Sequence, residues 1–268
     1  MGHSQRVKRA KKASQAGSRA VNAARRSAGS GRAGIYAGLA VIVVLGVVVG
    51  LGVWASRGRT PTLAAVPPVR VSATYPVDVR DGVVVAGQPS APTSVDAYED
   101  FLCPICDAFE SQHASTIQQA LTAGRISVHY HMLNLLEDRS NPPGYSLQAA
   151  NAGLCAAQAG VFPSYHASLY AKQPQEGGPG YTLDQLAALG HALGAGTSFE
   201  SCTRSGTYDA QVKAQLSAAE NNQTLLQQGP NGSSFGTPTV LVNGKLIPVL
   251  NPTGSAQFDQ LISPANTP

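Results

Sequence analysis

The sequence predicts an α/β domain that carries an inserted helical region and follows an apolar N-terminal segment. Residues 94–133 read as a strand, an amphipathic helix and a second strand. Helical patterns then fill about 142–228, and two short strands and a last helix follow. The expected architecture is therefore a strand–helix–strand half and a strand–strand–helix half, separated by a helical insertion.

Charge is divided unevenly along the 268 residues. Residues 1–34 contain nine Lys or Arg and no acidic residue, whereas the chain from Thr60 onward holds eight basic and fifteen acidic residues. A basic tail suits nucleic acid or anionic lipid. The apolar segment that follows favours lipid, so we expect a membrane and no nucleic-acid partner.

That apolar segment, "IYAGLAVIVVLGVVVGLGVW", runs for twenty residues from Ile35 without a charge. A helix of this length covers roughly 30 Å, the thickness of the hydrocarbon core of a bilayer. The positive charges before it place the N-terminus in the cytoplasm. The alternative is a cleaved signal peptide, because "VWA" at 53–55 offers small residues for a peptidase. We expect a single-pass protein of the cell membrane with these four parts: a basic cytoplasmic tail (1–34), a transmembrane anchor (35–55), a linker (56–79) and an extracytoplasmic domain (80–268).

The first half of that domain is predicted to contain strands on either side of one helix. "VDVRDGVVVAG" predicts a hairpin or edge strand, and "SVDAYEDFL" predicts the next strand. Apolar residues at helical spacing predict a helix up to Ala123, which Gly124 ends. "RISVHYHML" alternates and predicts a strand, which completes a βαβ unit.

The insertion begins with two helical stretches, "YSLQAANAGLCAAQAG" and "SYHASLYAKQ". "TLDQLAALGHALG" opens with Thr182 and Gln185 at capping-box spacing. "TYDAQVKAQLSAAENNQTLLQQG" is predicted to be one long helix. Asn243-Gly244 between "TPTVLV" and "KLIPVL" predicts a two-residue hairpin, and "SAQFDQLI" predicts the last helix.

All four cysteines follow the apolar segment, in a compartment that permits disulfides. Four cysteines allow three pairings, and proximity favours Cys103 with Cys106 and Cys155 with Cys202. We expect Cys155–Cys202 to be a structural disulfide within the insertion, with a second redox pair as the alternative.

The pair in "DFLCPICDAFE" has three possible interpretations: half of a zinc site, a staple, or a redox pair. A structural zinc site needs four ligands, and the chain has only one C-x-x-C. His129 and His131 alternate on one face of a strand and read as a solvated face or the rim of a groove, so no metal is expected. A disulfide across two residues closes too small a loop to constrain the unfolded chain much.

The redox interpretation has a mechanism. Pro104 fits the first turn of a helix, which places Cys103 at the helix N-terminus. Unpaired N–H groups and the positive end of the helix dipole stabilise a thiolate there. Such a thiolate attacks a substrate disulfide, and Cys106, one turn further on, resolves the mixed disulfide.

Two motifs and the insertion give the sequence a family resemblance. "EDFLCPIC" and "FGTPTVLVNGKLI" resemble the Cys-Pro-x-Cys segment and the cis-proline loop of the thioredoxin superfamily, and the helical insertion resembles its DsbA-like thiol–disulfide oxidoreductases. The resemblance covers about residues 80–265 and implies a thioredoxin-like fold with an inserted helical domain. It also implies roles for six positions: Cys103 as nucleophile, Cys106 as resolving thiol, Pro238 as cis-proline, and Thr237, Pro104 and Ile105 as substrate-binding residues.

Two positions depart from the family pattern. Ala97 stands where the family often has a buried acid six residues before the first cysteine, and Glu99 lies on the same strand face as a candidate replacement. Ile105 stands where strongly oxidising DsbA proteins have histidine, and Asp107 adds negative charge. We therefore expect a less depressed thiol pKa and a less oxidising couple, with Ile105 favouring apolar substrates.

The expected function is an extracytoplasmic oxidoreductase that donates disulfides to exported cysteine-containing proteins, without a cofactor. The resemblance implies a membrane quinone-linked reoxidase, of the DsbB or vitamin-K-epoxide-reductase (VKOR-like) kind, as partner. The chain has no spare segment for the dimerisation region that isomerases of this superfamily usually carry, so we expect a monomer. A reductase or isomerase of the same fold and a non-catalytic anchored binding module are the alternatives.

Overall fold

A computed structural model of the chain describes residues 63–229 and 232–263. The predicted tail (1–34), the predicted anchor (35–55) and the first residues of the predicted linker lie outside the described residues. Among the helices of the described part, none combines the length and apolarity that a membrane crossing needs.

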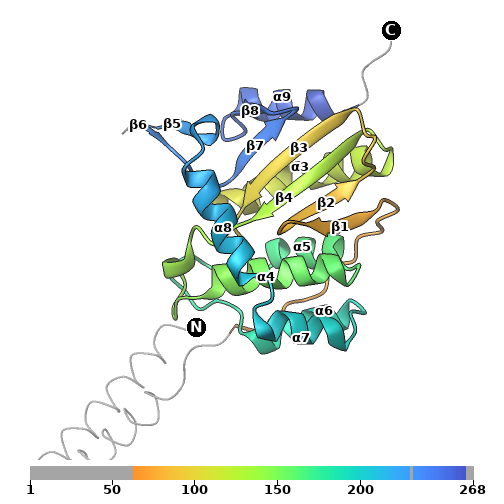
Figure 1. The fold of residues 1–268 in the computed structure, drawn as a ribbon, viewed down its shortest axis with the longest axis vertical. Helices are drawn as coiled ribbons and strands as arrows, with labels where there is room; N and C mark the ends of the chain where they lie inside the picture. Colours follow the sequence, from red (N-terminus) through yellow and green to blue (C-terminus); the bar gives the residue numbers. More distant parts are fainter. Residues whose placement is uncertain (1–62, 230–231, 264–268) are drawn as a thin grey trace, which may run out of the picture. The chain divides into compact units, whose positions relative to one another are not determined.

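A mixed six-stranded sheet forms the centre of the domain (Figure 1), in the order β1-β2-β4-β3-β7-β8. Neighbouring strands are antiparallel except β3 and β4, which run parallel and are joined by helix α3. The predicted βαβ unit is therefore present. The strands are β1 (Val77–Arg80), β2 (Val83–Gly87), β3 (Thr93–Glu99), β4 (Ile126–Met132), β7 (Thr239–Val242) and β8 (Lys245–Ile247).

Helices cover the sheet and extend beyond it. Helices α3 and α9 pack against one another. Helix α4 lies at the centre of the insertion and contacts its other helices as well as strands β1, β2 and β4. Figure 1 shows α6 and α7 on the side of α4 away from the sheet. The helices are α3 (Pro104–Thr122), α4 (Tyr145–Gln158), α5 (Phe162–Ala171), α6 (Leu183–Ala192), α7 (Thr197–Ser205), α8 (Asp209–Glu220) and α9 (Pro252–Ile262), with short 3-10 helices at Glu137–Arg139 and Gln223–Leu225.

Local sequence signals account for several element ends. Thr182 and Gln185 form the predicted capping box at the start of α6. Gly124 follows α3 with φ of 66°, a conformation that glycine adopts without a steric penalty. Asn243 and Gly244 have φ of 50° and 74° and turn β7 into β8, as a type I′ hairpin requires.

One predicted helix is wrong in its extent. The stretch 207–229, expected to be a single helix, forms α8 only from Asp209 to Glu220. A 3-10 turn and strand β5 (Gln227–Gly229) follow, and β5 pairs with β6 (Gly232–Ser234). Asn222 interrupts the helix because its side chain accepts a hydrogen bond from the N–H of Thr224 and so caps a new turn.

The described part of the predicted linker (56–79) is attached to the domain. Val66 is buried, and the N–H groups of Val69 and Val71 donate to the hydroxyls of Ser168 and Ser164 on α5. Residues 63–76 therefore form an extended strap along the insertion before β1 begins.

Candidate active site

Two reduced cysteines, Cys103 and Cys106, lie at the junction between strand β3 and helix α3. Cys103 is the residue before the first turn of α3, and Pro104 begins the helix. Both thiols are free, and Cys106 has no exposed surface while Cys103 is 5% exposed. Pro104 is exposed, and Ile105 between the cysteines is 51% exposed. The pair therefore lies just beneath a surface whose centre is an apolar side chain.

The two thiols differ in acidity. The pKa of Cys103 is lowered to about 6, first by the thiol of Cys106, which donates a hydrogen bond to it, and then, against the cost of burial, by the Thr237 side chain and the N–H groups of Cys106 and Ile105. Burial raises the pKa of Cys106 well above its ordinary value, and the hydrogen bond to Cys103 and the negative charges of Cys103 and Glu99 raise it further. At neutral pH Cys103 is thus mostly a thiolate and Cys106 a neutral thiol.

The loop before β7 faces Cys103. The Thr237–Pro238 peptide bond is cis, as the family resemblance implied. The sulfur of Cys103 lies 3.3 Å from the carbonyl oxygen of Thr237. The hydroxyl of Thr237 is buried and has no hydrogen-bond partner among the described residues, so it is free to donate to an anion at Cys103. The structure thus brings Cys103, Cys106, Thr237 and Pro238 together.

Asp100, which the sequence analysis missed, fixes the loop that carries the thiols. Its buried carboxylate accepts hydrogen bonds from the N–H groups of Leu102 and Leu136, each at 2.8 Å, and from the hydroxyl of Ser146 at 2.9 Å. Burial raises the pKa of Asp100 to about 7, against the lowering effect of these three bonds. Gln173 from the insertion also donates to the carbonyl oxygen of Cys103 at 2.9 Å. The contacts with Leu136, Ser146 and Gln173 join segments far apart in the sequence, which no local pattern reveals.

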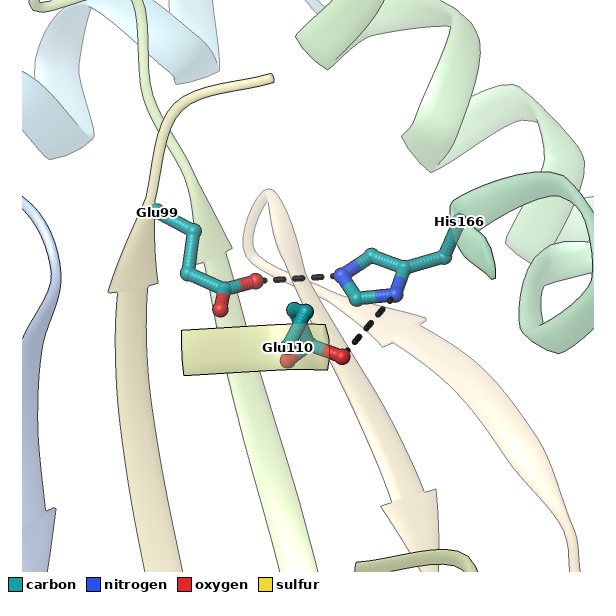
Figure 2. Close-up of side chains that lie close together, drawn as sticks. All are labelled: Glu99, Glu110 and His166. Carbon is teal, nitrogen blue, oxygen red and sulfur yellow. Dashed lines mark hydrogen bonds and ion pairs between the residues drawn. The ribbon is translucent and has the colours of Figure 1, made fainter. Parts of the chain in front are cut away.

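Glu99, Glu110 and His166 form a buried cluster (Figure 2), here called the carboxylate–imidazole cluster. Glu99 is coupled electrostatically to both active thiols. The imidazole Nε2 lies 3.0 Å from a Glu99 oxygen, and Nδ1 lies 3.8 Å from a Glu110 oxygen. Glu110 is seven residues after Cys103 and His166 belongs to α5, so only the Glu99 contribution had a sequence signal. Among the described residues this is the one group of three side chains close enough to be tested as a metal site. One donor atom from each of the three side chains lies within 4.8 Å of the others, and the imidazole turns a different nitrogen to each carboxylate.

The second cysteine pair lies within the insertion. Cys155 of α4 and Cys202 of α7 are joined in a disulfide that spans 47 residues of sequence. Both residues are buried. The bond therefore links two helices of the insertion, in the pairing that proximity favoured.

His129 and His131 lie apart from the thiols. They share the Asp96 carboxylate on the neighbouring strand β3, at 3.1 and 3.5 Å, and His131 also contacts Gln215 of α8. Their hydrogen bonds lower the pKa of Asp96 well below its ordinary value, against the effect of its partial burial. His131 is therefore part of the packing between the sheet and α8, while His129 stays partly exposed beside Asp96.

Comparison with known proteins identifies the class. A family model described as thioredoxin matches residues 80–263, and the chain belongs to this family. In sequence, the chain is similar to the serine/threonine-protein kinase PknE of Mycobacterium tuberculosis, with 34% identity over 163 residues. That match covers 59% of this chain but only 28% of the kinase.

Solved structures of thiol–disulfide oxidoreductases are similar as well. The reduced DsbG of Mycobacterium tuberculosis is 30% identical, with a TM-score of 0.53 over 66% of this chain and 82% of that one. The oxidised DsbA of the same organism is 31% identical, with a TM-score of 0.53 over 66% and 87%. MdbA of Corynebacterium diphtheriae shares the fold, at 24% identity and a TM-score of 0.57 over 72% and 95%.

These neighbours confirm the predicted enzyme class, a thiol–disulfide oxidoreductase with a thioredoxin-family domain. The family match and the DsbA-like structures also confirm the predicted thioredoxin-like α/β fold.

Proposed function

We propose that the chain is an extracytoplasmic disulfide donor for exported proteins, with Cys103 as nucleophile and Cys106 as resolving thiol. The observation that carries the proposal is the asymmetry of the two thiols. An acidic Cys103 at a helix N-terminus next to a fully buried Cys106 of raised pKa is the arrangement in which a stable thiolate favours the reduced protein. A couple whose reduced form is stabilised is an oxidant.

The donor reaction begins from the Cys103–Cys106 disulfide. A substrate thiolate attacks Cys103 Sγ, a substrate–Cys103 bond forms, the Cys103–Cys106 bond breaks, and Cys106 leaves with the electron pair and takes up a proton. A second substrate thiolate then attacks the substrate sulfur of the mixed disulfide and releases Cys103 as a thiolate. Two electrons pass from the substrate to the protein, which ends as the dithiol.

Substrate contacts are proposed for the surface around Cys103. The exposed side chains of Pro104 and Ile105 offer an apolar platform, and the backbone at Thr237-Pro238 offers hydrogen bonds to an extended segment. The substrates proposed are exported proteins with free cysteines.

The pKa of about 6 for Cys103 also bears on the strength of the oxidant. It falls between about 7 for thioredoxin and about 3.5 for DsbA. This pKa supports a redox couple that is less oxidising than DsbA. The physical reason is that Ile105, between the two cysteines, supplies no partial positive charge to stabilise the Cys103 thiolate.

A donor must be reoxidised, and we propose a membrane quinone-linked reoxidase of the DsbB or VKOR-like kind. The predicted anchor at 35–55 would keep the domain near such a partner, with the N-terminus in the cytoplasm. Fusing a reporter that is active only outside the cytoplasm to residue 268 tests this orientation, and an inactive fusion would overturn it.

The potential of the Cys103/Cys106 pair tests the direction of electron flow. The full-length chain, purified in detergent with Cys155–Cys202 oxidised, is equilibrated with glutathione buffers. A potential of about −120 to −200 mV supports a donor, and about −270 mV would make the chain a reductant. A pair that never equilibrates with glutathione would contradict any redox role.

A further inference from the structure

Cys106 must exchange a proton in each catalytic cycle, yet its side chain has no exposed surface. When the disulfide opens, the leaving Cys106 sulfur needs a proton, and when it closes, the same proton must leave. Burial makes a thiolate costly at Cys106, so its sulfur must be protonated when the disulfide opens. Because the side chain is not exposed to solvent, that proton has to pass through protein groups.

The carboxylate–imidazole cluster extends away from the thiols. Glu99 is at the end of β3, four residues before Cys103, and its charge acts on both cysteines. His166 then joins Glu99 to Glu110 through its two ring nitrogens, as Figure 2 shows. Oε1 of each glutamate is buried without a geometric hydrogen-bond partner among the described residues, and the two carboxyls lie close enough to affect each other's pKa as hydrogen-bonding neighbours. Each carboxyl therefore has an acceptor oxygen for a proton, and a variant at His166 separates the path through the imidazole from direct passage between the carboxyls.

The far end of the cluster reaches a cavity. Glu110 and His166 line a cavity of about 320 Å³ between the strap, α3, α5 and strands β2 and β4. Ala114 and Ser115, which are exposed, form part of the same wall, so the cavity opens to the surface. Water in the cavity can therefore exchange protons with Glu110.

We infer that His166 is a positioning residue that relays protons between Glu99, coupled to the thiols, and Glu110, at the cavity. This inference rests on the proposed function. In the donor direction Glu99 gives its proton to the leaving Cys106 sulfur, Nε2–H of His166 restores the proton of Glu99, and Nδ1 of His166 takes one from Glu110. Glu110 then regains a proton from cavity water, and the reverse direction uses the same steps backwards.

The surroundings keep the imidazole neutral, as a relay requires. The rings of Phe101, Tyr130, Phe162 and Tyr170 surround it at centroid distances of 4.9–5.6 Å. This burial lowers the pKa of His166 and raises that of Glu99 to about 8 and that of Glu110 well above its ordinary value. At neutral pH Glu99 thus holds a proton to give. The other titratable groups coupled to the cluster are Tyr75, Tyr130, Tyr170, Asp107, Cys103 and Cys106.

The test compares His166→Gln with His113→Gln in the full-length chain in detergent. His113 is a matched control because it too is buried and paired with a carboxylate, Asp259, but it belongs to the contact between α3 and α9. The rate at which a reduced cysteine peptide opens the Cys103–Cys106 disulfide is followed from pH 5 to pH 9.

His166→Gln is expected to slow this step at least about tenfold at pH 7 and to change the shape of the pH profile. The loss stays below the roughly 100-fold that removal of a proton donor itself produces, since water can substitute in part. The ultraviolet absorbance of the Cys103 thiolate should titrate as in the wild type, because His166 is not among the groups that lower that pKa. His113→Gln should leave both the rate and the profile unchanged.

A profile of unchanged shape in His166→Gln would overturn the relay, as would equal losses in both variants. Should His166→Gln fail to fold, Glu110→Gln carries the same expectation, because it removes the proton acceptor at the cavity without changing side-chain volume. Stoichiometric zinc binding that His166→Gln abolishes would make the cluster a metal site and also overturn the relay. An inactive wild type would remove the proposed function itself, and the relay with it.

Discussion

The chain contains two cysteine pairs in one domain, and their surroundings differ in almost every respect. Cys103 and Cys106 are free, lie at the junction of a strand and a helix N-terminus, and have an exposed Ile105 between them. Cys155 and Cys202 are bonded, lie inside helices α4 and α7, and are buried in the insertion.

The difference shows that position along a helix determines what a cysteine does. A thiol before the first turn receives N–H hydrogen bonds and the positive end of the dipole, which favour the thiolate. Helix-interior backbone amides are already paired within the helix, so a sulfur there gains no such stabilisation. The first pair can exchange electrons with a partner, while the second constrains two helices.

Removing one sulfur of the first pair tests whether that pair alone exchanges electrons. Cys103→Ser is expected to reduce exchange with a cysteine peptide by on the order of 10⁴-fold or more, as loss of a covalent nucleophile does. Cys202→Ala should retain exchange through Cys103. Equal loss of activity in both variants would show that the second pair takes part in the redox chemistry.

The second largest effect is on stability, and it concerns the other pair. Removing both Cys155 and Cys202 by substitution with Ala is expected to lower the free energy of unfolding by about 4 kcal/mol, from the chain entropy of a loop that spans 47 residues. Denaturant unfolding of the two proteins measures it. The potential of the Cys103/Cys106 pair should stay the same, and a shifted potential would show that the disulfide positions the active thiols.

The sequence allowed the first pair to be predicted well because its signals are local. The strand, Pro104 and the two cysteines lie in one short stretch, and the capping box and the Asn243-Gly244 turn are local patterns too. The same reasoning failed for residues 207–229, where helical composition continued past Asn222 although a side-chain cap ended the regularity.

The supports of the site could not be predicted because they come from distant segments. Asp100 lies in a predicted strand, yet its carboxylate accepts hydrogen bonds from the N–H of Leu136 and the hydroxyl of Ser146, 36 and 46 residues away. His166 lies in a stretch that the sequence predicts only to be helical. Only the packing of α5 against the end of β3 places its imidazole next to Glu99.

A third prediction concerns the cost of burying a carboxyl that is coupled to the active pair. Glu99 has a pKa of about 8, above its ordinary 4.5, because it is buried. Such a group stabilises the fold fully below its unfolded pKa, and this stability is lost as the pH rises from about 4.5 through about 8. Glu99→Gln should therefore raise the free energy of unfolding at pH 8 by up to about 4 kcal/mol, since each pKa unit corresponds to 1.36 kcal/mol and the native carboxyl is half titrated there, and change it little at pH 4.

Urea unfolding of the reduced proteins across this pH range is the measurement. Glu200→Gln is the control, because Glu200 is an exposed glutamate of α7, beside the second cysteine pair, with a pKa lowered by His191 and Arg204. It should show no gain at pH 8. A Glu99→Gln gain that is the same at pH 4 and pH 8 would mean that the pKa of Glu99 is not raised.

The smallest effect distinguishes two threonines whose buried hydroxyls both lack a hydrogen-bond partner among the described residues. Thr237 faces Cys103, whereas Thr203 follows Cys202 in α7. Thr237→Val should raise the pKa of Cys103 by about 1 or less, because a hydrogen bond to a charged group contributes roughly 1.5–3 kcal/mol with good acceptors and sulfur accepts more weakly. Thr203→Val should leave that pKa unchanged and stabilise the fold slightly, since a methyl group replaces an unpaired hydroxyl. Titration of the thiolate absorbance decides the matter: an unchanged pKa in Thr237→Val would mean that the helix N-terminus and Cys106 alone make Cys103 acidic.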